Sequence, residues 1–182
     1  MLKENKQINK DKVIAMLYNE SPNKGAKEAI EILRRIKNEY ENLQIILFGY
    51  KKGEQIPENF EFYENPQRDQ LISIYRKADI YLFPSKHEAW GLPVIEAMAS
   101  KCAVVGMNVG CIEELCTDGK NALIAESNDY EELEKKLRIV IENDNIINTI
   151  GLEGYELAKT HTWKVSFEKF EKYLINICSK TL

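Results

Sequence analysis

The sequence is poor in the residues that build metal sites and membrane spans. Its 182 residues include two histidines and four cysteines, and no two cysteines form a C-x-x-C pair. No strict D-x-D motif occurs, and no apolar run approaches the ~20 residues that a membrane-spanning helix needs. The formal net charge of −4 disfavours a dedicated nucleic-acid-binding protein. These absences favour a globular protein that requires no metal and binds no nucleic acid.

The four cysteines are typical of a protein kept in a reducing compartment. Cys102 adjoins an apolar run and Cys178 lies in an amphipathic stretch, so we expect both to be small core residues. Because no pairing pattern is present, we expect a reduced, cytoplasmic protein. Residues 1–11 are polar and rich in lysine, and we interpret them as a linker or interdomain segment rather than a nucleic-acid or membrane patch.

Apolar runs of strand length alternate with amphipathic stretches of helix length. We expect strands at 13–18, 43–48, 60–63, 80–83, 103–106 and 122–124. We expect helices at 25–40, 69–77, 93–100, 112–115, 129–142, 146–159 and 164–178. Apolar strands separated by helices indicate a parallel sheet covered on both faces. The sequence therefore predicts an α/β fold: a doubly wound, Rossmann-like α/β/α domain of three layers with about six strands.

The segment 84–99 carries the strongest functional signal. It follows the apolar run 80–83, contains Gly91 and Pro93 where a loop should become a helix, and places Glu88 and Glu96 on either side of that turn. A loop that leads from a parallel strand into a helix N-terminus is a natural phosphate site. Carboxylates beside it accept hydrogen bonds from sugar hydroxyls. An acidic residue near a helix start is favoured by the helix dipole alone, which explains Glu96 without a ligand but not Glu88.

A second loop repeats this pattern. Lys24 and Gly25 follow the first expected strand and precede the first expected helix. A lysine beside a helix N-terminus suits a diphosphate, although Lys24 considered alone is more simply a solvated lysine. The two loops together favour a ligand with both phosphates and hydroxyls, such as a nucleotide sugar.

Further short pieces occur in a fixed order around these two loops. They are Ala78-Asp79, Pro84-Ser85, Ala103-Val104-Val105, Val109-Gly110, Glu114, Asp118-Gly119 and Thr162-Trp163. With Lys24-Gly25 and the segment 88–99, they make the chain resemble the donor-binding, C-terminal half of a GT-B glycosyltransferase of the retaining group called glycosyltransferase family 4. The resemblance runs from about Lys12 to Tyr173, and Glu88 and Glu96 stand at the family's E-x7-E spacing.

The resemblance implies a role for each matching residue. Glu88 contacts donor-sugar hydroxyls near the reacting carbon, and Lys24 neutralises the diphosphate leaving group; these are the expected catalytic residues. The expected donor-binding residues are Asn19, Gly25, Trp90, Gly91, Leu92 and Glu96. Of these, Glu96 is expected to bind the ribose hydroxyls of the nucleotide. Trp90 replaces a usual phenylalanine, and Asn19 stands where the family usually has an arginine, so one of two diphosphate cations is missing or supplied elsewhere.

The resemblance also implies a division into domains. We expect residues 12–182 to form the donor domain, without the N-terminal GT-B domain that binds the acceptor, so that the chain alone transfers nothing. Expected partners are a UDP-, GDP-, ADP- or dTDP-linked sugar, that missing domain, and a glycan or lipid-linked acceptor. We expect no cofactor and no metal, and the intact enzyme is compatible with work at the inner face of the membrane.

Three other functions compete with a transferase domain. The chain could be a stand-alone nucleotide-sugar binding or regulatory module, which Asn19 favours slightly. It could belong to another enzyme of the GT-B superfold, such as a sugar-nucleotide epimerase or a phosphorylase, although the E-x7-E spacing favours the transferase. A dinucleotide oxidoreductase is disfavoured because no G-x-G-x-x-G follows the first strand.

Overall fold

The computed structural model describes residues 11–180, and residues 1–10 of the expected linker lie outside the described residues. The strands are β1 (Val13–Leu17), β2 (Gln44–Gly49), β3 (Glu61–Glu64), β4 (Ile80–Phe83), β5 (Ala103–Met107) and β6 (Leu123–Ala125). A 3₁₀ turn, Pro22–Lys24, precedes α1 (Ala26–Glu39). The other helices are α2 (Arg68–Lys77), α3 (Leu92–Ala99), α4 (Cys111–Leu115), α5 (Tyr130–Ile141), α6 (Asp144–Lys159) and α7 (Trp163–Lys180).

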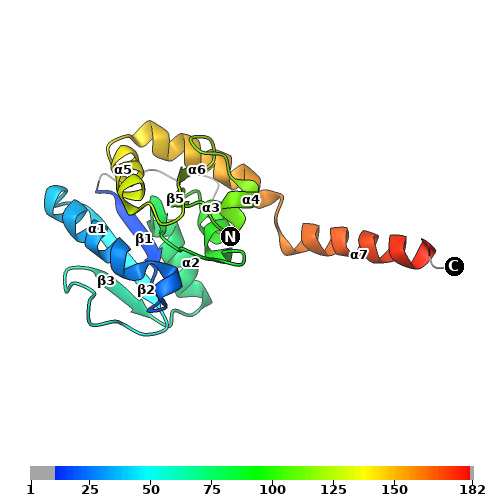
Figure 1. Ribbon diagram of the computed structural model, residues 1–182, viewed down its shortest axis with the longest axis horizontal. Helices are drawn as coiled ribbons and strands as arrows, with labels where there is room; N and C mark the ends of the chain where they lie inside the picture. Colours follow the sequence, from blue (N-terminus) through cyan, green and yellow to red (C-terminus); the bar gives the residue numbers. More distant parts are fainter. Residues whose placement is uncertain (1–10, 181–182) are drawn as a thin grey trace.

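The six strands form one parallel sheet in the order β3-β2-β1-β4-β5-β6 (Figure 1). Strand β1 lies at the centre, where Ile14 is paired with Ile45 of β2 on one side and with Ile80 of β4 on the other. The strands β4 and β5 are buried along their whole length, as the continuous apolar runs predict for a sheet covered on both faces. The predicted fold is confirmed.

The helices cover both faces of this sheet. The chain moves outward from β1 to β2 in one direction and from β4 to β5 in the other, so right-handed crossovers place α1 and α3 on opposite faces. Helix α1 packs beside α5, and α3 packs beside α6. On α1, the apolar stripe that includes Ala29, Leu33 and Ile36 is fully buried. The result is the expected three-layer arrangement.

Helix α7, which was expected at 164–178, does not bury its apolar stripe. It extends away from the body of the domain (Figure 1), and Trp163, Phe167, Phe170 and Leu174 are all exposed. Cys178 is exposed too, so its assignment to the core was wrong, whereas Cys102 is buried with its thiol 3.1 Å from the Tyr75 carbonyl oxygen. Helical periodicity shows that one face is apolar, but it does not specify what covers that face.

Neither α7 nor any other helix within residues 11–180 is long and apolar enough to cross a membrane.

Candidate functional site

The expected site residues lie at the carboxyl edge of the sheet, where the chain leaves β1, β4 and β5. Strands β1 and β4 are neighbours, and the order of strands reverses between them. Crevices outside such a reversal are the usual ligand sites of doubly wound sheets. The loops after β1 and β4 are joined there, since the Lys86 amide donates to the Asn23 carbonyl at 2.8 Å.

A pocket of about 320 Å³ opens at this edge. It is lined by Lys24 from the loop after β1, by Glu88 and Trp90 from the loop after β4, and by the start of α3 from Leu92. Gly91 also lines the pocket and begins α3 with a left-handed φ of 96°. A side chain there would be strained and would meet the Phe83 ring at 3.1 Å, so glycine keeps the helix start close to the pocket.

Lys24 and Glu88 form an ion pair across the two loops. The Nζ of Lys24 lies 2.5 Å from Oε2 of Glu88, and the two side chains are 29% and 17% exposed. Both residues also line a second pocket, of about 460 Å³, together with Ser21, Val109 and Glu113. The two proposed catalytic side chains, 64 positions apart in the sequence, are therefore brought into direct contact.

Glu96 lies near the start of α3, as expected, but beyond its first turn. Its carboxylate accepts a hydrogen bond from the Tyr75 hydroxyl at 3.0 Å. Burial raises the pKa of Glu96, and this hydrogen bond opposes the rise. Glu96 lines a neighbouring pocket of about 540 Å³ that it shares with Trp90 and Leu92. Those two residues thus border both pockets.

Sequence reasoning missed Tyr75 as a partner of Glu96. Tyr75 lies on the buried face of α2 and is itself fully buried. Only the packing of α2 near α3 brings its hydroxyl to the carboxylate, so the sequence carries no local signal for this contact.

Besides Glu96, two expected donor-binding residues, Asn19 and Gly25, do not line the pocket that holds Lys24 and Glu88. The side chain of Asn19 accepts from the Ser21 amide at 2.8 Å and lines a separate pocket with Glu28 and Lys86. Gly25 is buried beneath the site with a left-handed φ of 62°. A Cβ atom there would lie 2.1 Å from the Pro84 carbonyl oxygen, so only glycine lets the loops after β1 and β4 pack this closely.

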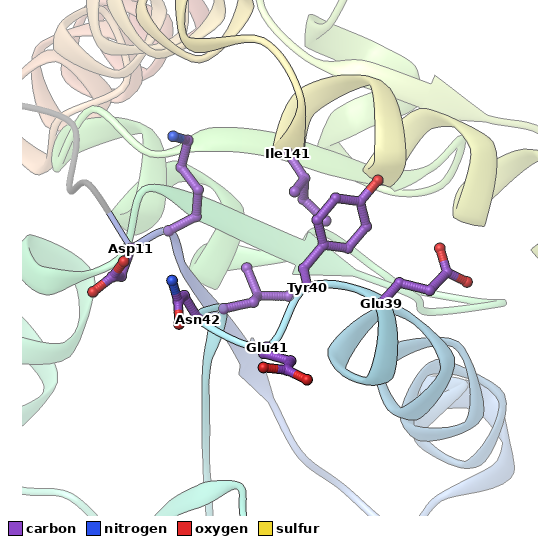
Figure 2. A pocket seen from close by; sticks show the side chains of 8 residues that line it. Asp11, Glu39, Tyr40, Glu41, Asn42 and Ile141 are labelled. Carbon is purple, nitrogen blue, oxygen red and sulfur yellow. The ribbon is translucent and has the colours of Figure 1, made fainter.

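A larger pocket, of about 520 Å³, lies at the opposite, amino edge of the sheet. Figure 2 shows that Tyr40 and the turn after α1 line it together with Ile141 from α5. Lys12 beside it is paired with Asp144 at 2.6 Å. None of the expected site residues lies there. Among the described residues, no group of three or more histidine, cysteine or acidic side chains is arranged to hold a metal ion.

Fold and pocket together define the chain as a Rossmann-like domain with a pocket at the carboxyl edge of its parallel sheet. The chain belongs to the family of glycosyl transferases group 1, whose family model matches residues 2–156. A structure of the C-terminal domain of a group 1 glycosyl transferase, LpcC from Francisella tularensis, is similar with a TM-score of 0.74 at 24% identity, over 87% of this chain and 93% of that one. The expected family is confirmed, and the fold is similar to that of a C-terminal domain from this family.

Two further comparisons describe proteins longer than this chain. An uncharacterised glycosyltransferase of Methanocaldococcus jannaschii is 33% identical over 96 residues, which cover 53% of this chain and 27% of that protein. The structure of HepE from Anabaena in complex with UDP-glucose has a TM-score of 0.76 at 19% identity, and covers 92% of this chain and 49% of that one. The chain spans about a quarter to two fifths of the length of the curated relatives it matches first.

Proposed function

We propose that this chain is the donor-binding half of a retaining glycosyltransferase, which transfers a hexose-type sugar from a nucleoside diphosphate sugar to a glycan or lipid-linked acceptor. The observation that carries the proposal is the Lys24–Glu88 pair at the mouth of a pocket that the start of α3 also lines. It places a cation, a carboxylate and a helix N-terminus around one space. This combination suits a ligand with phosphates and hydroxyls.

Each group has a task in the transfer. Lys24 and the positive end of the α3 dipole hold the diphosphate, and they stabilise the negative charge that grows on it as the bond to the sugar breaks. Glu88 accepts hydrogen bonds from hydroxyls of the transferred sugar. Glu96, one helical turn further along α3, accepts hydrogen bonds from the ribose hydroxyls.

Trp90 and Leu92 border both the pocket of Lys24 and the pocket of Glu96, and this continuity supports one extended ligand across the two. In this proposal the acceptor is bound by a second domain N-terminal to the donor domain, so the chain alone transfers no sugar.

The placement of Asn19 favours a second candidate, a nucleotide-sugar binding or regulatory module. Asn19 holds the Ser21 amide and lines a separate pocket, so it does not supply a second group for the diphosphate. Such a module binds the donor weakly and needs no transfer step. Sugar transfer after recombination with a GT-B acceptor domain separates the two candidates, because a module stays inactive in that assay.

Calorimetry with hexose sugars linked to UDP, GDP, ADP and dTDP tests the donor site, and UDP-glucose is the first probe because the similar HepE structure holds it. We expect one of these ligands to bind. The substitution Lys24→Met should lower its affinity by about tenfold or more, since a hydrogen bond to a charged group is lost. The matched control is Lys12→Met, which removes a lysine at the amino edge and should leave binding unchanged.

Two outcomes contradict the proposal. If the wild-type chain binds none of the four nucleotide sugars, the site is wrongly assigned although the fold stands. If the chain alone transfers sugar efficiently to a defined acceptor, the division of labour between two domains is wrong.

A further inference from the structure

The Lys24–Glu88 pair lines two pockets at the carboxyl edge of the sheet. One contains the start of α3 and Trp90, and the other contains Ser21 and Glu113; Lys24 and Glu88 line both. Among the described residues that line either pocket, Lys24 is the one lysine or arginine. A phosphate group that enters either of these two pockets therefore has a single ammonium group to bind in its lining, and a carboxylate already lies 2.5 Å from that group.

The ion pair is also held in place by its surroundings. Both side chains are more than two thirds buried, which reduces the screening of their attraction by water. The loops that carry them are joined by backbone hydrogen bonds from Lys86 and His87 to the Asn23 carbonyl, at 2.8 and 3.4 Å. An anion that binds Lys24 therefore competes with Glu88 for the same ammonium group, and the carboxylate stays close to the anion.

We propose that Glu88 determines ligand specificity by competing with phosphate for Lys24, so that the site prefers a nucleotide that carries a sugar over the free nucleoside diphosphate. The proposal rests on the donor-site function given above. When a sugar is present, its hydroxyls donate hydrogen bonds to the displaced carboxylate and compensate for the lost ammonium group. A free diphosphate offers no such donor, and it leaves two negative groups side by side in a partly buried place.

This competition has a consequence for the end of the reaction. Once the sugar has left, Glu88 loses its hydroxyl partners and returns to Lys24. Its return expels the nucleoside diphosphate product, so the same carboxylate favours binding of the donor and release of the spent nucleotide.

The test uses inorganic pyrophosphate, because this probe has neither base nor sugar. Glu88→Gln removes the competing charge and keeps the size of the side chain, and we expect it to bind pyrophosphate and UDP about tenfold more tightly than the wild type. The control is Glu113→Gln, which neutralises a carboxylate that lines one of the two pockets but is not the ion-pair partner of Lys24, and it should change both affinities less than about twofold. In the double variant Lys24→Met/Glu88→Gln the gain should vanish.

A second measurement concerns the ratio of affinities. We compare the affinity for UDP-glucose with that for UDP, or the affinity for the hexose donor that binds best with that for its own nucleoside diphosphate. This ratio should fall in Glu88→Gln, because only the sugar-free ligand gains affinity. The proposal is overturned if Glu88→Gln leaves pyrophosphate affinity unchanged or lowers it, if neither protein binds pyrophosphate, or if Glu113→Gln gains as much. A gain for pyrophosphate without binding of any nucleotide sugar keeps the competition and rejects the donor function. If a nucleotide sugar binds but Glu88→Gln gains no affinity for pyrophosphate, the donor function is kept and the competition is rejected.

Discussion

The two edges of the sheet hold pockets of opposite character. At the amino edge the pocket measures about 520 Å³, and Lys12 and Tyr40 beside it are bonded to Asp144 and Glu142 of neighbouring elements. At the carboxyl edge the pocket measures about 320 Å³, and its lysine is held by Glu88 from another loop. The larger pocket is thus surrounded by contacts that tie elements together, whereas the smaller one is built around groups that suit a ligand. Chemistry, not volume, distinguishes the site.

The loops at the two edges also differ in how tightly they pack. Gly25 supports the carboxyl edge, with a left-handed φ of 62° and the Pro84 carbonyl oxygen 2.1 Å from the place a Cβ would take. Gly119 precedes β6 on the amino side with a similar φ of 73°, but nothing lies within 4 Å of the place a Cβ would take. The same backbone conformation is therefore demanded by close packing at one edge and by a simple turn at the other.

The largest expected effect comes from adding one methyl group at each of these glycines. Gly119→Ala should lower the free energy of unfolding by about 1 kcal/mol, the cost of the left-handed conformation alone. Gly25→Ala should lower it by about 2–5 kcal/mol, since the Cβ must also push apart the loops after β1 and β4. Urea unfolding of both variants measures the difference.

Ligand binding provides a second readout for this pair. Gly25→Ala should also lose pyrophosphate binding, because Lys24 moves with the loop, while Gly119→Ala should keep it. Equal losses of stability in the two variants would show that the carboxyl edge is not packed more tightly than the amino edge.

Much of the fold and part of the site could be predicted from the sequence. A strand buried on both faces needs a continuous apolar run, so 80–83 was recognised at its observed bounds. The position of Glu88 and Trp90 at the site followed from the strand that precedes them, because the loops after parallel strands meet at one edge. These predictions rest on local patterns that the fold leaves little freedom to change.

What could not be predicted depends on packing between distant segments. The bond from Tyr75 to Glu96 needs α2 and α3 to be correctly placed, and the contact of Lys24 with Glu88 needs two separate loops. The stripe that includes Phe167 has the same periodicity as that of α1, yet one is exposed and the other buried. Periodicity belongs to a single helix, whereas burial belongs to a pair of surfaces.

Carboxylates that hold the fold together and carboxylates that serve a ligand should differ in how their contribution to stability depends on pH. Glu134 of α5 accepts hydrogen bonds from Arg35 of α1 and from Arg138, which lower its pKa. Its stabilising contribution is present above the unfolded-state pKa of roughly 4.3 and is lost as the pH falls through the lower folded-state value. Glu134→Gln should therefore cost about 1 kcal/mol at pH 7 and much less below pH 4.

Urea unfolding between pH 3 and pH 7 measures this difference. A double-mutant cycle with Arg35→Met serves as the control, because the two effects should be non-additive if the residues act through one contact. A cost for Glu134→Gln that does not change with pH would contradict the proposed link to ionisation.

Glu96 should show the opposite sign, and the smallest effect. Burial raises its pKa, so the folded state binds its proton more tightly than the unfolded state, and the group's contribution to stability falls as the pH rises through the folded-state value. Glu96→Gln keeps an oxygen for the Tyr75 hydroxyl and removes the partly buried charge. We therefore expect its Tm at pH 7 to exceed that of the wild type by no more than about 2 °C, and the two to coincide below about pH 4.

Calorimetric melting at several pH values checks this, with Glu153→Gln on the exposed surface of α6 as the control that should leave Tm unchanged. Nucleotide binding should weaken in Glu96→Gln although the protein becomes more stable, because a neutral amide is a poorer acceptor for two ribose hydroxyls than a carboxylate. Such a gain in stability with a loss of binding is expected where a carboxylate is kept for a ligand and not for the fold. A lower Tm at pH 7 would instead place Glu96 with Glu134 among the carboxylates that hold the domain together.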